Sequence, residues 1–150
     1  MKQKIGFIFG TTLFLLFLSI RGSVVWAGNY NTDSNGVAIK GYDSVAYFER
    51  GEAVRGKSDY RYEWSGVKWY FASSAAKDKF VAHPQKYAPQ YGGYCAYAVS
   101  RGSKADSDPT VWTIVEGKLY LNLNASVKSL WERDRDNNIK NADNLWKNLQ

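Results

Sequence analysis

The sequence predicts an α+β fold, in which two β-hairpins form a small antiparallel sheet that packs against three or four short helices. Two stretches of alternating apolar and polar residues each surround a two-residue turn, Ser65-Gly66 in one and Glu116-Gly117 in the other. This pattern is typical of hairpins. Apolar residues at helical spacing follow both stretches, so we expect helices to cover the hairpins. With 6 Trp, 11 Tyr and 7 Phe among 150 residues, the chain can fill one compact core.

The first half of the chain contains one strand, one hairpin and one helix by these criteria. Residues 45–48 are rich in apolar and aromatic side chains and predict a short strand. Residues 60–72 alternate as the first hairpin. A serine at 73 or 74 can cap a helix that runs to about residue 81. His83-Pro84 ends this helix, because the residue before a proline is pushed away from helical dihedral angles.

The middle of the chain is irregular around a pair of glycines. Residues 85–93 read as an ordered connection that contains Gly92-Gly93. Residues 94–99 fit either a strand or a short helix. The helix is favoured, because Ala96 and Ala98 are poor strand residues and Gly102 lies where a helix C-terminal glycine belongs.

The C-terminal third predicts the second hairpin and two helices. Residues 111–115 and 118–123 flank the Glu116-Gly117 turn and form the hairpin. Residues 126–133 and 137–149 place apolar side chains at helical spacing, which predicts two amphipathic helices at the end of the chain.

The domain organisation begins with a segment that resembles a secretory signal peptide at residues 1–27. Lys2 and Lys4 precede an apolar run over residues 5–20, and Val25-Trp26-Ala27 fits a cleavage site. A retained membrane anchor is the alternative, but the run is short of the roughly 20 residues that span a bilayer. We therefore expect an exported protein, periplasmic or extracellular, without a stable membrane span after cleavage. A flexible, polar N-terminal arm at 28–36 and a single domain at 37–150 follow.

Composition excludes several classes of protein. One Cys and one His cannot supply an internal disulfide, a Cys/His zinc finger or an iron–sulfur centre. Removing residues 1–27 takes away three basic residues and no acidic one, which lowers the net charge from +6 to +3. The remaining Lys and Arg are scattered among acidic residues, so the chain lacks the basic stripe of a nucleic-acid-binding protein.

Four segments together resemble the YHS domain, and in particular its exported subfamily, most of whose members have no established biochemical role. They are GYDSVAYF at 41–48, WYFAS at 69–73, FVAHPQKYAP at 80–89 and YGGYCAY at 91–97. The resemblance implies a small treble-clef-like core and, in the wider family, a metal held by two cysteines. This chain departs from that pattern, because it has Asp43-Ser44-Val45-Ala46 and Tyr70-Phe71-Ala72-Ser73 at the two cysteine-bearing segments. The paired cysteines are therefore missing.

Cys95 and His83 are the candidate metal ligands that remain. A thiolate with an imidazole suits copper or zinc, and an exported protein would meet copper directly. His83 has a simpler interpretation, because a histidine in the last turn of a helix is stabilised by the helix dipole. Cys95 is also a candidate reactive thiol, since a helix that starts at Gly92-Gly93 would lower the thiol pKa. A buried, packed cysteine is the alternative.

Three interpretations of function stay open. The protein is a small binding module for a metal such as copper or for another small ligand near Cys95, a thiol-dependent redox protein, or a structural or interaction domain in which Cys95 packs. The sequence identifies no catalytic residue, because no Gly-x-Ser-x-Gly elbow accompanies the single His. It does not name the ligand, a cofactor or a protein partner.

Overall fold

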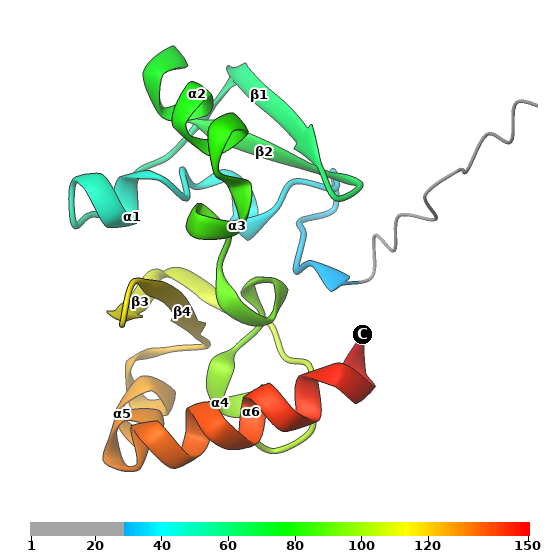
Figure 1. Cartoon of the computed structure of the whole chain (residues 1–150), viewed down its shortest axis with the longest axis vertical. Coiled ribbons are helices and arrows are strands. Elements are labelled where there is room, and N and C mark those ends of the chain that lie inside the picture. The colour runs from blue at the N-terminus through cyan, green and yellow to red at the C-terminus, as the bar shows by residue number, and fades with distance from the viewer. Residues whose placement is uncertain (1–28) are drawn as a thin grey trace, which may run out of the picture.

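The computed structural model describes residues 29–150, and the predicted signal peptide at 1–27 lies outside the described residues. Figure 1 shows the first hairpin with helices α1 and α2 in the upper half of the molecule and the second hairpin with α4, α5 and α6 in the lower half. The α+β class is confirmed. No helix within residues 29–150 is both long enough and apolar enough to cross a membrane.

The upper half is built from the N-terminal elements. In chain order these are the 3-10 helix η2 (Ile39–Gly41), α1 (Ala46–Glu49), β1 (Lys57–Trp64), β2 (Val67–Phe71), α2 (Ser74–Ala82) and α3 (Pro84–Tyr87). Ser73 caps α2 by accepting a hydrogen bond from the Ala76 N–H at 3.1 Å, and α2 ends before His83-Pro84 as predicted. The first hairpin and its helix therefore follow directly from local sequence signals.

The lower half holds the remaining elements. They are the 3-10 helix η3 (Gln90–Gly93), α4 (Ala96–Val99), β3 (Asp108–Val115), β4 (Lys118–Asn122), α5 (Ala125–Arg133) and α6 (Arg135–Leu149). The second hairpin and both C-terminal helices are confirmed. Residues 94–99 contain a short helix, α4, which was the favoured alternative.

Two details of the prediction are wrong. The two hairpins do not join one sheet: β1 pairs only with β2, and β3 pairs only with β4, as two separate antiparallel sheets. Residues 45–48 belong to the helical turn α1 instead of a strand. The Asp43 side chain explains this turn, because its Oδ1 accepts hydrogen bonds from the Val45 and Ala46 N–H groups at 2.9 and 3.3 Å.

Strand β4 lies between two clusters of buried side chains. Leu119 and Leu121 belong to the cluster under the first hairpin, with Trp69, Phe71 and Phe80. Tyr120 points the other way, into the cluster made with α4, α5 and α6: Tyr91, Ala96, Val99, Trp131 and Ala142. Because side chains along a strand point alternately to opposite faces, β4 contributes residues to both clusters. It also creates the boundary at which the connection from α3 to η3 crosses from one half to the other (Figure 1).

The segment predicted as a flexible arm is held to the domain from Asn29 onward. The Asn31 N–H donates to the Gly92 carbonyl at 2.8 Å, and the Asn31 Nδ2 donates to Asp106 Oδ1 at 2.9 Å. Tyr30 packs edge-on against the rings of Trp64 and Trp69, at centroid distances of 5.8 and 5.5 Å. One tyrosine and one asparagine therefore anchor a segment whose composition offers little else to bury.

Candidate ligand-binding cleft

Cys95 lies in the interior, between α4 and β4. Its side chain is free of any disulfide and only 1% exposed, and its Sγ lies 3.6 Å from Asn122 Oδ1. The Cys95 N–H donates to the Ala105 carbonyl at 3.0 Å, and Cys95 bridges to Leu121 of β4. The thiol does precede a helix, but α4 has only four residues. Cys95 is therefore closed off from solvent by the elements around it.

His83 lies elsewhere, exposed between α2 and α3. It lines a shallow cavity of about 310 Å³ together with Trp64, Ala82, Pro84, Gln85 and Lys86. Cys95 is not among these lining residues. Within residues 29–150, no three His, Cys, Asp or Glu side chains gather closely enough to hold a metal ion.

The positions that correspond to the missing cysteines do come together. Ala46 and Ala72 line one cavity of about 250 Å³ between α1 and the start of α2. Both Asp43 oxygens beside them already accept backbone hydrogen bonds, Oδ1 from Val45 and Ala46 and Oδ2 from Ala72 at 2.9 Å. Two methyl groups and a carboxylate that already accepts three backbone hydrogen bonds do not fit the two-cysteine metal site that the family resemblance implies.

The surroundings of Cys95 do not favour a cation either. Asn122 is fully buried, and its Oδ1 accepts from the Tyr97 N–H at 3.2 Å as well as from the thiol. Its Nδ2 has no hydrogen-bond partner in the part of the chain that is described. This leftover group is an N–H donor, which has no lone pair to offer a metal.

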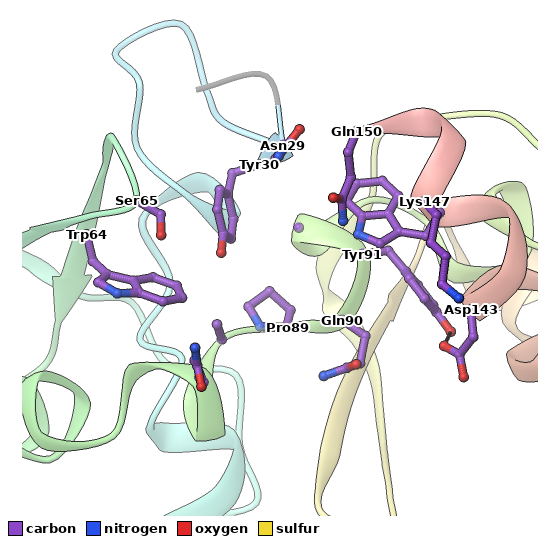
Figure 2. Close-up of a pocket in the computed structure, with 14 residues that line it drawn as sticks. Asn29, Tyr30, Trp64, Ser65, Pro89, Gln90, Tyr91, Asp143, Lys147 and Gln150 are labelled. Carbon is purple, nitrogen blue, oxygen red and sulfur yellow. Dashed lines mark hydrogen bonds between the residues drawn. The ribbon is translucent and has the colours of Figure 1, made fainter. Parts of the chain in front are cut away.

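An open, aromatic-lined cleft lies between the two halves of the molecule. It has a volume of about 690 Å³. Figure 2 shows Tyr30, Trp64 and Ser65 on one side, Tyr91, Asp143 and Lys147 on the other, and Pro89 between them. The full lining set is Asn29, Tyr30, Trp64, Ser65, Gln85, Ala88, Pro89, Gln90, Tyr91, Gly92, Asp143, Trp146, Lys147 and Gln150. This volume lies within the roughly 300–1,000 Å³ typical of small-molecule sites.

The first wall of the cleft is a packed aromatic cluster. Trp64, at the end of β1, contacts Tyr30 and Phe80 edge-on at centroid distances of 5.8 and 5.7 Å. Burial raises the pKa of Tyr30, so its hydroxyl stays protonated at neutral pH. The wall is rigid because the core holds it from behind, while half-buried Trp64 and Tyr30 still reach the cleft.

The second wall combines η3 with α6. Tyr91 Oη donates to Asp143 Oδ1 at 2.8 Å, and burial together with this carboxylate raises the pKa of Tyr91. The Tyr91 ring packs against Trp146 with centroids 6.0 Å apart, and Tyr94 packs against the same indole at 6.1 Å. The hydroxyl of Tyr91 is thus a fixed hydrogen-bond donor at neutral pH.

The YGGYCAY segment shapes this wall through its backbone. Tyr91 has a φ of 54°, a left-handed conformation that is costly for a residue with a side chain. A Cβ at Gly92 would lie 1.7 Å from the Asn29 carbonyl oxygen, so only glycine lets the N-terminal arm approach. Gly93 has a φ of 79°, and a Cβ there would lie 3.0 Å from Ile39 Cγ2. The glycine pair therefore brings arm and wall together.

The two site residues predicted from the sequence, Cys95 and His83, do not line this cleft. The cleft itself was not predicted. The aromatic residues were assigned to one compact core, and Tyr30 was placed in the flexible arm. The available signal was Gly92-Gly93, which was interpreted as a helix start that acts on Cys95. The residues that approach this glycine pair, Asn29 and Asn31, are about sixty residues away in the chain, beyond the reach of a local pattern.

Comparison with known families gives one match. Residues 45–91 match the family described as the YHS domain. The matched segment contains Ala46 and Ala72 and ends at Tyr91, the first residue of the YGGYCAY segment. Searches of curated proteins and of solved structures found no match.

Proposed function

Since residues 45–91 match the YHS domain family, we propose that this protein is a small exported binding module that holds a small organic ligand in the aromatic cleft. One observation carries the proposal. The YGGYCAY segment begins at Tyr91, the last residue of the YHS match. It places Tyr91 in the wall of the open cleft and buries Cys95 in the interior.

Rigidity supports a binding role for the cleft. Each wall is packed from behind by buried aromatic residues, and the strained Tyr91 backbone is held by the Asn31 to Gly92 hydrogen bond at 2.8 Å. Pre-organised aromatic surfaces lose little conformational entropy when a ligand binds. A lining that mixes aromatic rings with a few polar groups is the usual composition of a small-molecule site.

A structural role for Cys95 is the second candidate that a specific observation favours. Its thiol is buried against Asn122, and its backbone bridges to β4. A free cysteine in an oxidising compartment persists when it is buried. The metal and redox interpretations of Cys95 remain predictions, and both require solvent or an ion to reach this thiol.

Export is part of the proposal. It is supported by the basic start, the apolar run and the Val25-Trp26-Ala27 junction, which predict a mature chain that begins at Gly28. Intact mass spectrometry of the protein from the exported fraction tests this. A chain that retains residues 1–27 would show that the segment anchors the protein instead.

The binding role is tested by screening a small-fragment library against the purified protein by ¹H–¹⁵N NMR. We expect hits to shift the indole signals of Trp64 and Trp146 and to leave that of the buried Trp131 in place. Cu(I) titration in the same assay provides the comparison. A protein whose cleft signals respond to no fragment, while Cu(I) shifts the signals around Cys95, would contradict the proposal.

A further inference from the structure

The polar groups of the cleft are mostly uncharged. Five lining residues carry an amide or an aliphatic hydroxyl: Asn29, Ser65, Gln85, Gln90 and Gln150. The three glutamines are all of the glutamines that residues 29–150 contain. Amides both donate and accept hydrogen bonds, which matches a ligand whose own groups do both.

The lining of the cleft contains one charged side chain of each sign. Asp143 is the acidic residue and Lys147 is the basic one. The Asp143 carboxylate already accepts the Tyr91 hydroxyl at 2.8 Å. The Lys104 ammonium lies 5.4 Å from the centroid of the Trp146 ring, so one face of that indole already meets a cation. The side chains of the lining therefore carry no net charge that would select a strongly charged ligand.

The aromatic residues offer apolar faces on both walls. Ring contacts stay within each wall, with Tyr30 and Trp64 at 5.8 Å and Tyr91 and Trp146 at 6.0 Å. Half-buried Tyr30 and Trp64 on one wall and half-buried Trp146 on the other therefore offer separate aromatic surfaces along an open cleft, not a slot closed around one flat ring. A wholly apolar ligand would strip water from the amides without replacing their hydrogen bonds, which is costly.

We infer that the cleft takes a neutral carbohydrate, an inference that rests on the proposed function. A sugar ring presents C–H groups to the electron-rich face of an aromatic residue and places hydroxyls around its rim. Hydroxyls donate and accept as the lining amides do. Aromatic surfaces on both walls, in a cleft that is also lined by amides, suit an oligosaccharide with more than one sugar ring.

The probe is chitotriose, a neutral trimer, measured by titration of tryptophan fluorescence on the purified protein. Its fully deacetylated counterpart has the same backbone with three amino groups, which are positively charged in mildly acidic buffer, and serves as the charged control in that buffer. Adenosine tests a flat heteroaromatic ligand. We expect chitotriose to bind at least about tenfold more tightly than either control, because the side chains of the lining carry no net charge and form no closed slot.

Two variants and one control locate the site. Gln85→Ala, at an exposed position on α3, is expected to weaken chitotriose binding by about threefold to tenfold through the loss of one hydrogen bond. Trp64→Ala is expected to weaken it by about tenfold or more through the loss of an aromatic surface. Asn148→Ala removes an exposed amide of α6 that does not line the cleft and is expected to leave binding unchanged.

The outcomes separate this inference from the proposed function. Chitotriose binding that Gln85→Ala weakens and Asn148→Ala does not would support both. Fragments that shift the cleft signals, with chitotriose no tighter than its controls, would overturn the carbohydrate inference and leave the binding role. A cleft that binds neither the fragments nor the trimer would overturn both.

Discussion

The seven residues from Tyr91 to Tyr97 build two regions of opposite character. On one side Tyr91 and Gly92 line an open cleft, with a strained backbone and a hydroxyl held by Asp143. On the other side Cys95 lies in the interior, where its thiol contacts Asn122 and its backbone joins β4. Cys95, which has the most reactive side chain, is only 1% exposed, whereas Tyr91 and Gly92 line the cleft.

The difference teaches that a rare residue in a motif need not be the chemical centre of that motif. The bridge between Cys95 and Leu121 holds the YGGYCAY segment against β4 on the side away from the cleft. The glycine pair then lets the N-terminal arm approach from the front. In our account Cys95 is the support of the wall, and the cleft is the functional surface.

Truncation of one tryptophan on each side should give the largest contrast. Trp131→Ala removes a fully buried side chain from the cluster behind the YGGYCAY segment and should cost about 3–5 kcal/mol of unfolding free energy. Trp146→Ala removes a half-buried side chain from the cleft wall and should cost about 1–2 kcal/mol. Urea denaturation measures both. Equal losses would mean that the cleft wall is as buried as the core.

A pair of glycine variants isolates the close approach of the arm. Gly92→Ala and Gly102→Ala both place a side chain at positive φ, 59° and 81°. Only at Gly92 does the new Cβ meet the Asn29 carbonyl, at 1.7 Å, whereas nothing lies within 4 Å at Gly102. We expect Gly102→Ala to cost about 1 kcal/mol and Gly92→Ala about 2 kcal/mol more, with release of the arm.

Protection of the Asn31 amide from hydrogen exchange reports that release, because its N–H donates to Gly92. The protection should be lost in Gly92→Ala and kept in Gly102→Ala. Comparable protection of the Asn31 amide in both variants would show that the position of the arm does not depend on residue 92 being a glycine.

Cys95→Ala should have a moderate effect on stability and none on the cleft. The variant removes one buried sulfur and its weak contact with Asn122, which should cost about 1 kcal/mol of unfolding free energy. Affinity for cleft-binding fragments should stay within about twofold, because Cys95 does not line the cleft. A large loss of fragment affinity without a loss of stability would place the thiol in the site.

The acid side of the pH profile should give the smallest effect. Burial raises the pKa of Asp106, but hydrogen bonds from Lys40, Asn31 and Ser107 together hold it below the ordinary value of 3.8. The pKa of this carboxylate is lower in the folded state than in the unfolded state. It therefore stabilises the folded state fully at a pH above its unfolded-state pKa, and this contribution is lost as the pH falls through its folded-state pKa. Arm anchoring should therefore weaken below about pH 4.

Asp106→Asn should weaken arm anchoring in the same way at neutral pH. The expected loss of stability is about 0.5–1 kcal/mol, because the ion pair with Lys40 is largely exposed. The Asn31 amide protection measures it. If the variant and the parent lose protection at the same pH, Asp106 does not anchor the arm.

Local signals in the sequence predicted most of the fold. Both hairpins, the Ser73 cap and the end of α2 at His83-Pro84 depend on neighbouring residues, and all are as expected. The α1 turn was missed because apolar and aromatic side chains outweighed Asp43 as a turn former. The separation of the hairpins into two sheets depends on packing across β4, which no local pattern carries.

The candidate site was less predictable than the fold. Tyr30, Trp64 and Tyr91 are distant in sequence and line one cleft only because Asn31 and Gly92 join the arm to η3. The burial of Cys95 belonged to one of the three interpretations left open, and finding that burial required knowing that Cys95 bridges to β4.

Alkylation of Cys95 tests the central claim most directly, because the claim requires this thiol to be closed while the cleft is open. The protein is treated with iodoacetamide with and without 8 M urea (about the concentration that unfolds a small domain), and the mass increase is followed over time. We predict that the folded protein reacts at least about a hundredfold more slowly than the unfolded one, since the thiol reacts only through opening of the structure. Alkylation of the folded protein at a rate close to the unfolded rate would contradict the account and return Cys95 to the functional site.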